Sequence, residues 1–312
     1  MVAEGDILKA NNEHGHICIF GEVLFDHFPD NSRVLGGAPF NVAWNLHAFG
    51  QAPCFISRVG DDAEGKQIQE TMEQWGMGTS ALQCDLEHCT GRVNVDFTDN
   101  EPEYSIAEPC AYDFIAPSPK VHDTLRDCAL LYHGTLALRD PVSKAGFSAL
   151  RKQHSGRVFL DVNLRTLWWR KEQVLSMIGQ ADWVKLNADE AALLFGLEQD
   201  IEQGLIRLIS KHKLQGIILT RGAQGAMVVT AAKKVYTAHP EKNIYLVDTV
   251  GAGDAFASII ILGLHNNWPI AISIERAQQF ASAVVGQRGA TVTDRNFYDT
   301  FICQWQTEII TD

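Results

Sequence analysis

The sequence predicts an α/β protein with a doubly wound, mostly parallel sheet, helices on both faces, and a small β-sheet lid. Short β-rich runs alternate with longer amphipathic runs through most of the 312 residues, and this alternation favours a parallel sheet covered by helices. Two stretches, 22–37 and 91–108, interrupt the alternation and predict the lid. Because no repeat and no Pro/Ser-rich linker divides the chain, we expect one main domain with a lid.

The period of the apolar residues predicts each element of the sheet and of its helical layers. β-rich apolar runs predict strands at 17–20, 54–59, 130–133, 158–161, 183–186 and 216–220. Apolar residues at helical spacing predict helices at 40–49, 64–75, 142–153, 172–178, 190–195, 201–212 and 258–264. A parallel sheet binds its ligands at the carboxyl ends of its strands, so polar residues directly after these strands are candidate site residues.

The composition indicates an acidic chain with ample apolar content for a core. Hydrophobic residues make up 46%, and 26 Lys and Arg against 38 Asp and Glu give a net charge of −12. Such a surface repels phosphate backbones and anionic lipids, which argues against nucleic-acid or membrane binding through a basic face. The seven cysteines are odd in number without a Cys-x-x-Cys pair, and the first residues carry no apolar leader. We therefore expect a cytoplasmic protein whose residues 1–15 form a flexible tail.

The strongest chemical signal is Asp-Thr-Val-Gly-Ala-Gly-Asp at 248–254, followed by an apolar helical run. Gly251, Ala252 and Gly253 are small enough for backbone N–H groups to converge on an anion at a helix start, where the helix dipole adds positive charge. Asp254 would accept the proton of an attacking hydroxyl. The alternative is a tight turn with an ordinary acid in the first helical turn.

A second signal is Gly-Gly-Ala-Pro-Phe-Asn at 36–41, which opens a predicted helix. Gly36 and Gly37 allow close approach of the backbone to a ligand, and Asn41 both donates to and accepts from vicinal hydroxyls. Taken alone, Gly-Gly-x-Pro is also typical of a turn that leads into a helix.

The two motifs, in this order, resemble those of the ribokinase-like (PfkB-type) carbohydrate kinases, and they are closest to fructokinases. The resemblance covers 16–293, which with an extension to 312 forms the expected main domain. Five further segments match family motifs in order: Gly-Glu-Val-Leu-Phe-Asp at 21–26, Arg-Val-Gly-Asp-Asp at 58–62 with Gly65, Asp-Val-Asn-Leu-Arg at 161–165, Asn-Ala-Asp-Glu at 187–190, and Thr-Arg-Gly at 220–222 with Gly225.

The resemblance implies a sugar site formed by Asp26, Gly36, Gly37, Asn41 and Arg165. The Asp26 carboxylate leaves a predicted strand and would accept two sugar hydroxyls, whereas a solvated loop acid is the alternative. Arg165 would supply a cation for a sugar or phosphate oxygen. The neighbouring Arg170 and Lys171 suit a basic surface patch equally well.

The resemblance also implies an ATP site formed by Asn187, Thr220, Gly222 and Gly225. Glu190 would hold Mg²⁺ through water, because Mg²⁺ prefers few protein ligands and many waters. The Asn-x-x-Glu spacing of Asn187 and Glu190 equally predicts plain helix capping. Lys185 lies inside a predicted strand, two residues before Asn187, and whether its side chain points towards the phosphates stays open. The segment 278–289 resembles the family's adenine-side wall and equally suits the core.

A K⁺ site beside the 248–254 motif follows from the same resemblance. Asp248 matches the acid that begins the family's motif, and Val250 would add a carbonyl oxygen near the 289–293 loop. The alternative is that Asp248 only caps the turn.

Together these features predict an ATP-dependent kinase that transfers the γ-phosphoryl group to a sugar hydroxyl, most closely a fructokinase. Asp254 is the expected base, and 251–253 form the expected anion hole. Two alternatives stay open. One is another kinase of the family, acting on ketodeoxygluconate, ribose or a nucleoside. The other is a sugar- or nucleotide-binding protein without catalysis, which would have no need of a base at Asp254.

The lid is expected to cover the sugar and keep water from the γ-phosphate, with Phe97 or Tyr104 against the sugar ring. A hairpin with Val93, Val95, Phe97 and Ile106 would otherwise leave apolar surface and an open sheet edge in water. Lid-to-lid packing of two copies would cover both, so a homodimer is expected. The alternative is a monomer whose lid packs on its own main domain.

Overall fold

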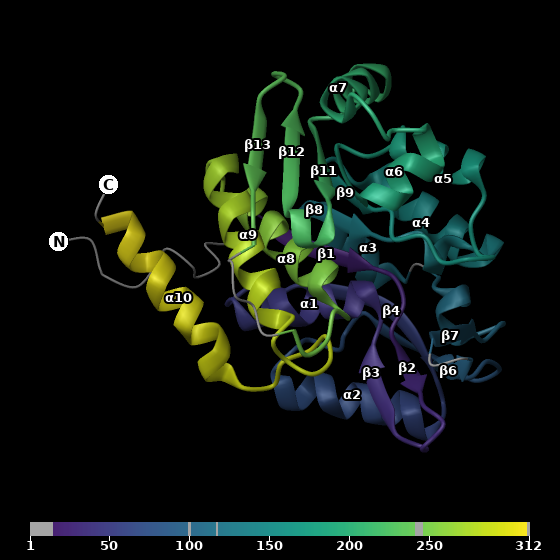
Figure 1. The fold of residues 1–312 in the computed structure, drawn as a ribbon. Coiled ribbons are helices and arrows are strands. Elements are labelled where there is room, and N and C mark those ends of the chain that lie inside the picture. Colours follow the sequence, from purple (N-terminus) through teal and green to yellow (C-terminus); the bar gives the residue numbers. More distant parts are fainter. Residues whose placement is uncertain (1–14, 99–100, 117, 241–245, 311–312) are drawn as a thin grey trace.

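The structure, a computed structural model, describes residues 15–98, 101–116, 118–240 and 246–310. Its largest element is a nine-stranded sheet in the order β13-β12-β11-β10-β9-β8-β1-β4-β5 (Figure 1). All neighbours from β11 to β5 run parallel, and the two strands at the other edge, β12 and β13, are antiparallel. The predicted mostly parallel sheet is confirmed.

Six of the nine strands match the predicted ones. The strands are β1 (His16–Phe20), β4 (Cys54–Gly60), β5 (Leu82–Asp85), β8 (Cys128–His133), β9 (Arg157–Asp161), β10 (Trp183–Asn187), β11 (Gly216–Thr220), β12 (Ala226–Thr230) and β13 (Val235–Ala238). The strands missing from the prediction are β5, β12 and β13. Both β5 and β13 are edge strands with a single buried residue each, and a strand with so little buried surface has a weak apolar pattern.

Helices cover both faces of the sheet. They are α1 (Ala38–Ala48), α2 (Ala63–Trp75), α3 (Pro119–Arg126), α4 (Pro141–Gln153), α5 (Lys171–Ile178), α6 (Ala188–Phe195), α7 (Ile201–His212), α8 (Ala252–His265), α9 (Ile270–Val284) and α10 (Arg295–Ile310). The predicted helices are all present, whereas α3 and α10 were not predicted and α9 was expected only in part, within the segment 278–289. None of the helices in the described part of the chain is long and apolar enough to cross a membrane.

Strand β1 explains why two layers of helices form. Its side chains alternate between the faces of the sheet, so Ile17 and Ile19 join the core that contains residues of α1, α8 and α9. Cys18 and Phe20 join the opposite core, which contains residues of α3 and α4. The doubly wound arrangement therefore follows from a strand that is apolar on both faces.

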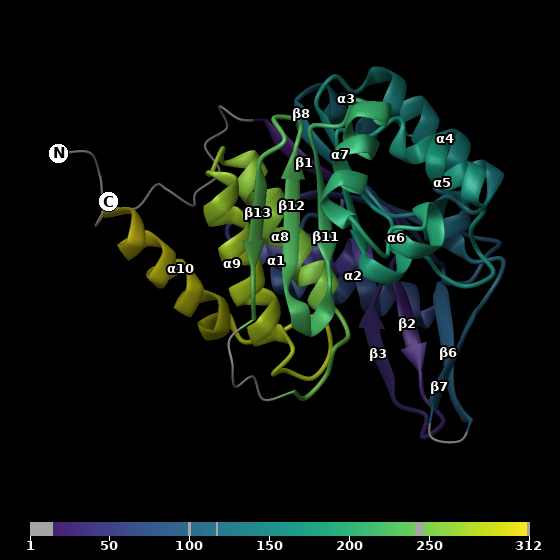
Figure 2. The same ribbon diagram turned by 45° about the horizontal axis from the view of Figure 1, so that its top comes forward.

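A second sheet has the order β3-β2-β6-β7 and projects from one side of the main body (Figure 2). It consists of β2 (Leu24–His27), β3 (Arg33–Gly36), β6 (Gly91–Thr98) and β7 (Glu101–Ile106). The prediction that 22–37 and 91–108 form one small sheet is confirmed, although Glu22 and Val23 are buried before the sheet begins. Asp99 and Asn100, which belong to the predicted stretch 91–108, lie outside the described residues, as does the predicted tail up to residue 14.

The small sheet packs on its own chain, which corrects one expectation. Val93 and Val95 are only 6% and 2% exposed, and Val93 belongs to the same core cluster as Phe20 and Tyr112. The expectation that these valines leave apolar surface in water is therefore wrong, because both are already buried within the single chain. Tyr104 is 61% exposed, and the side chain of Phe97 lies outside the described residues.

One carboxylate on α2 ties the small sheet to the main body. The Oε1 atom of Glu64 lies 2.9 Å from Nε2 of His27 and 3.0 Å from Nη1 of Arg33, and its Oε2 atom lies 3.6 Å from Nη2 of Arg92. These three side chains come from β2, β3 and β6, respectively. Glu64 is 8% exposed, so the contact joins three strands to one buried anion.

Candidate active site

The strand order brings the predicted motifs to one edge of the sheet. The segments that carry Asp26, Arg165, Asn187 and Thr220 follow or end β1, β9, β10 and β11, respectively. Parallel strands present their carboxyl ends at a common edge, and β11, β10, β9, β8 and β1 are consecutive in the sheet. Segments far apart in the sequence therefore meet there.

The Gly-Ala-Gly turn is held in a shape that only glycine permits. Gly251 caps α8 with φ +81°, and a Cβ atom at this position would lie 2.3 Å from Cβ of Ala290. The first N–H groups of α8 have no carbonyl partner within the helix and carry the positive end of its dipole. The turn is thus suited to bind an anion, as the sequence predicted.

Asp254 lies in the first turn of α8, half-buried, and the side chain of Asn41 contacts it. The Nδ2 atom of Asn41 donates a hydrogen bond of 2.8 Å to Oδ2 of Asp254. Burial raises the pKa of Asp254 to about 6, against the lowering effects of this hydrogen bond and of Lys185. A carboxylate with this pKa is ionised at neutral pH and is a better proton acceptor than a free aspartate.

A buried ion pair lies beside the anion turn. Nζ of Lys185 donates hydrogen bonds of 2.9 and 2.8 Å to the two carboxylate oxygens of Asp161. A Cβ atom on Gly253 would lie 3.5 Å from the same Nζ, so the ammonium group faces the turn. Burial opposes the charged form, but Asp161, Asp254 and Glu190 outweigh it and raise the pKa of Lys185. Lys185 therefore points towards the predicted phosphate region, which the sequence left open.

A guanidinium group lies within electrostatic range of three carboxyl groups at this edge. Burial raises the pKa of Glu22 to about 7 and that of Asp26 to about 6, and Arg165 partly offsets both shifts. Arg165 also lowers the pKa of Asp254. Arg165 is exposed, whereas Asp26 is half-buried. The predicted sugar residues Asp26 and Arg165 are thus near each other, and Glu22 is a third acid that the sequence did not single out.

Asn187 and Glu190 form a helix cap. The Asn187 side chain accepts from the Glu190 N–H at 2.8 Å, and the Asn187 N–H donates to Oε2 of Glu190 at 2.8 Å. The Leu164 N–H donates to Oε1 of Glu190 at 2.7 Å, which links α6 to the segment after β9. The capping alternative is therefore realised, and each Glu190 oxygen keeps lone pairs for a water molecule.

The turn after β11 also needs glycine. Gly225 has φ +84°, and a Cβ atom there would lie 2.0 Å from the carbonyl oxygen of Ala238. Gly222 has φ +53° with open space around its Cα. A cavity of about 290 Å³ lies next to this turn between β13 and α9, and its lining residues are Thr237, Ala238, His239, Glu275, Gln278, Gln279 and Ser282. Three of these residues belong to the segment 278–289, which resembles the family's adenine-side wall.

Asp248 holds the turn that precedes the anion hole. Its Oδ1 atom accepts from the Val250 N–H at 2.9 Å, and its Oδ2 atom accepts from the Gly289 N–H at 3.1 Å. This is the capping alternative of the sequence analysis. Within the described residues, no three His, Cys, Asp or Glu side chains come together as metal ligands, so a cation here would depend on carbonyl oxygens.

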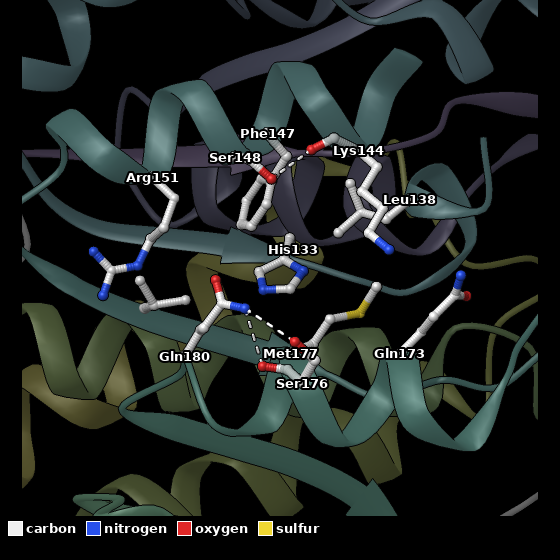
Figure 3. A pocket seen from close by; sticks show the side chains of 11 residues that line it. His133, Leu138, Lys144, Phe147, Ser148, Arg151, Gln173, Ser176, Met177 and Gln180 are labelled. Carbon is white, nitrogen blue, oxygen red and sulfur yellow. Dashed lines mark hydrogen bonds between the residues drawn. The ribbon is translucent and has the colours of Figure 1, made fainter. Parts of the chain in front are cut away.

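A separate small cavity of about 50 Å³ lies between α4 and α5, with the buried His133 among its lining residues (Figure 3). Ser148 donates to the Lys144 carbonyl, and the Gln180 side chain donates to the Ser176 carbonyl and hydroxyl. These polar groups are satisfied within α4 or by one another, and no predicted site residue lines the cavity. We assign it no function.

The sequence reasoning missed Glu22 as a site residue and Asp161 as the partner of Lys185. Both residues were inside quoted motifs, at 21–26 and 161–165. Position at the end of a strand was the available signal, because β9 ends at Asp161 and Glu22 follows β1 by two residues. The pairing with Lys185 becomes visible only when β9 and β10 are neighbours.

An α/β sheet with an acidic side chain beside an anion-binding turn is typical of enzymes that act on phosphate groups. The chain belongs to the pfkB family of carbohydrate kinases, whose family model matches residues 12–295, and it is an ATP-dependent sugar kinase. It is 31% identical over 270 residues to a fructokinase of Klebsiella pneumoniae, covering 80% of this chain and 85% of that protein. It is 29% identical to a fructokinase of Escherichia coli, covering 80% and 84%.

Solved structures share the fold. A fructokinase from Vibrio cholerae O395, in fructose-, ADP- and calcium-bound form, matches with a TM-score of 0.77 and 25% identity, covering 94% of this chain and 99% of that chain. A fructokinase from Xylella fastidiosa with bound ATP has a TM-score of 0.80 at 19% identity, covering 93% and 98%. At that identity the second match supports the fold alone. The predicted ribokinase-like fold is confirmed.

Proposed function

We propose that this kinase is a fructokinase, which transfers the γ-phosphoryl group of ATP to a hydroxyl of fructose. The observation that carries the proposal is the hydrogen bond between Asn41 and Asp254, because it joins the predicted sugar motif to the predicted base. The fructokinases of Klebsiella pneumoniae and Escherichia coli support fructose as the sugar.

In this mechanism Asp254 accepts the proton of the attacking hydroxyl as that oxygen bonds to the γ-phosphorus, and the bond to the β-phosphate oxygen breaks. The N–H groups of Gly251, Ala252 and Gly253 stabilise the charge on the transferred group. Lys185 faces the same turn and adds positive charge. Asn41 orients Asp254 and keeps it ionised.

The sugar would be held by Asp26, Gly36, Gly37, Asn41 and Arg165. The half-buried Asp26 carboxylate accepts from two hydroxyls, and the Gly37 turn brings backbone close to the ring. We propose that the small sheet closes over this site as a lid and keeps water from the γ-phosphate. Its contact with Glu64 fixes its orientation on the main body.

ATP would be held by Asn187, Thr220, Gly222 and Gly225, with the adenine towards the cavity between β13 and α9. Mg²⁺ fits at Glu190 through water, because the carboxylate oxygens keep free lone pairs beside the Asp161–Lys185 pair. The ion would neutralise phosphate charge. K⁺ would bind at Asp248 and the carbonyl oxygen of Val250, a proposal supported by a Vibrio cholerae fructokinase variant solved in potassium-bound form.

The experiment is an ADP-release assay with MgATP and a panel of fructose, ribose, ketodeoxygluconate, tagatose 6-phosphate and adenosine. We expect fructose to have the highest kcat/KM and Asp254→Asn to lose about 10²- to 10⁴-fold in kcat. Another sugar ranking first would overturn fructose as the substrate. Equal rates for wild type and Asp254→Asn would overturn the mechanism. If no acceptor is phosphorylated while sugars still bind, the chain is a binding protein.

A further inference from the structure

Asp161 and Lys185 point to the face of the sheet that α8 covers. Side chains alternate between the two faces along a strand, and Phe159 of β9 and Trp183 of β10 belong to the core that contains residues of α8. Asp161 and Lys185 lie two residues further along the same strands and are register partners. The pair therefore lies between the sheet and α8, near the strand ends where a parallel sheet binds its ligands.

The ammonium group of Lys185 has a donor to spare. Its Nζ atom donates hydrogen bonds of 2.9 and 2.8 Å to Oδ1 and Oδ2 of Asp161, and these are its only hydrogen bonds among the residues that the structure describes. An ammonium group has three N–H donors. A Cβ atom on Gly253 would lie 3.5 Å from the same Nζ. The third donor is therefore available to an anion bound at the turn 251–253.

The stability of the fold gives no reason for an ion pair at this place. Lys185 is 6% exposed and Asp161 is 1% exposed, and two apolar residues of similar volume often stabilise a buried position as well as an ion pair does. Backbone hydrogen bonds already join the two strands, one of them from the Val162 N–H to the Lys185 carbonyl at 2.9 Å. The pair is therefore better explained by a task at the turn.

Several elements place charged or titratable groups around Lys185. Burial opposes its charged form, whereas Asp161 of β9, Asp254 of α8 and Glu190 of α6 favour that form and together raise the pKa of Lys185. Burial and Asp161 raise the pKa of Tyr132 on β8, so this phenol is neutral. Asp161 is the acid with the largest effect on Lys185. Without its charge, burial would lower the pKa of Lys185 and the lysine would lose its proton as the pH rises.

We propose that Asp161 is a positioning residue for phosphoryl transfer, which holds the Lys185 ammonium group against the anion turn so that its third N–H donates to the transferred γ-phosphoryl group. The inference rests on the proposed function, in which the turn 251–253 holds that group. Asp161 does not touch the reacting atoms and acts through Lys185. Both the direction and the charge of the lysine then depend on Asp161.

The test compares Asp161→Asn, Lys185→Met and the double variant at pH 7, with the acceptor that ranks first in the panel above. Lys185→Met should lower kcat about 10²-fold, the effect of removing one donor to a developing charge. Asp161→Asn should lower kcat about tenfold, with the acceptor KM within about twofold. Because the two residues act as a unit, the double variant should be no slower than Lys185→Met. Losses that multiply in the double variant overturn the proposal.

Asp113→Asn is the matched control for a buried acid with a cationic partner. Asp113 is 1% exposed and accepts hydrogen bonds of 2.7 Å from Nε and Nη2 of Arg139, and neither residue belongs to the anion turn. Asp113→Asn should lower Tm but leave kcat within about twofold. A loss of kcat as large as that of Asp161→Asn would show a general effect of breaking a buried pair and would overturn the proposal.

The pH dependence separates this role from a merely structural one. Relative to wild type, kcat of Asp161→Asn should fall between pH 7 and 9.5, because Lys185 loses its proton in that range when the neighbouring charge is gone. The double variant has no lysine to titrate, so its kcat relative to wild type should stay constant. A constant ratio for Asp161→Asn, or a fall that persists in the double variant, overturns the proposal.

Calorimetry gives a readout that does not depend on turnover. Lys185 is proposed to contact the γ-phosphoryl group, so Asp161→Asn should bind a non-hydrolysable ATP analogue about tenfold more weakly and ADP within about twofold of wild type. Equal losses for the two nucleotides, or no loss for the analogue, overturn the proposal. A wild type that phosphorylates no acceptor overturns the proposed function, and the inference falls with it. A first-ranked acceptor other than fructose overturns fructose alone, and the inference is tested with that acceptor.

Discussion

The ionisation of Asp254 should set the acid side of the pH–rate profile. With a pKa of about 6, Asp254 is about nine-tenths ionised at pH 7 and about one-tenth ionised at pH 5. A protonated carboxyl cannot accept the hydroxyl proton. We therefore expect kcat/KM for fructose to be half-maximal near pH 6 and to fall at least tenfold per pH unit below it, because Asp26 has a similar pKa and is protonated in the same range.

Asn41 provides the perturbation that tests this reasoning. Its 2.8 Å hydrogen bond stabilises the ionised form of Asp254, and a hydrogen bond to a charged group contributes about 1.5–3 kcal/mol. That energy corresponds to about one to two pKa units. Because Asp254 is half-buried and water reaches it, we expect a shift of about one pKa unit, the lower end of this range. Asn41→Leu should therefore move the pH at which kcat/KM is half-maximal from about 6 to about 7.

The assay measures initial rates of ADP release between pH 5 and 8.5 without coupling enzymes. The ionisation of MgATP is the same for both proteins, so the difference between the two profiles reports on the enzyme. Asn41→Leu also loses a proposed sugar contact, which lowers kcat/KM at every pH without moving the pH at which it is half-maximal. The reasoning would be refuted if kcat/KM of the wild type and of Asn41→Leu fell at the same pH. A wild-type kcat/KM that stayed constant down to pH 5 would refute it as well.

Three further predictions concern the anion turn, the cation and the oligomer. Gly251→Ala should abolish turnover, because the new Cβ would lie 2.3 Å from Ala290 at φ +81°; activity near wild type would contradict the proposed turn geometry. Replacing K⁺ by a large organic cation should lower kcat if Asp248 and Val250 bind K⁺, and an unchanged rate counts against that site. Light scattering should give about twice 34.6 kDa, with exposed Tyr104 and Val34 in the interface; a monomer mass removes the dimer.

The sequence by itself determined the architecture and the chemical inventory of this protein. Strands that are apolar on both faces, such as β1, require helices on both sides, and that requirement is local and visible in a single run of residues. The turn at Gly251 was also predicted as a site from local pattern, because small residues directly before a helix allow backbone to approach a ligand. The turn at Gly225 was predicted only from the family resemblance.

Only the tertiary structure decided which side chains act on one another. Asn41 and Asp254 are 213 residues apart, and Asp161 meets Lys185 because β9 and β10 are neighbours. Val93 and Val95 are buried in the single chain, in a strand that lies between β2 and β7. Periodicity encodes which residues are apolar on which face, whereas burial and charge pairing depend on the spatial order of the strands. Glu22 acquires its raised pKa in this way, because burial in the folded chain opposes its charged form.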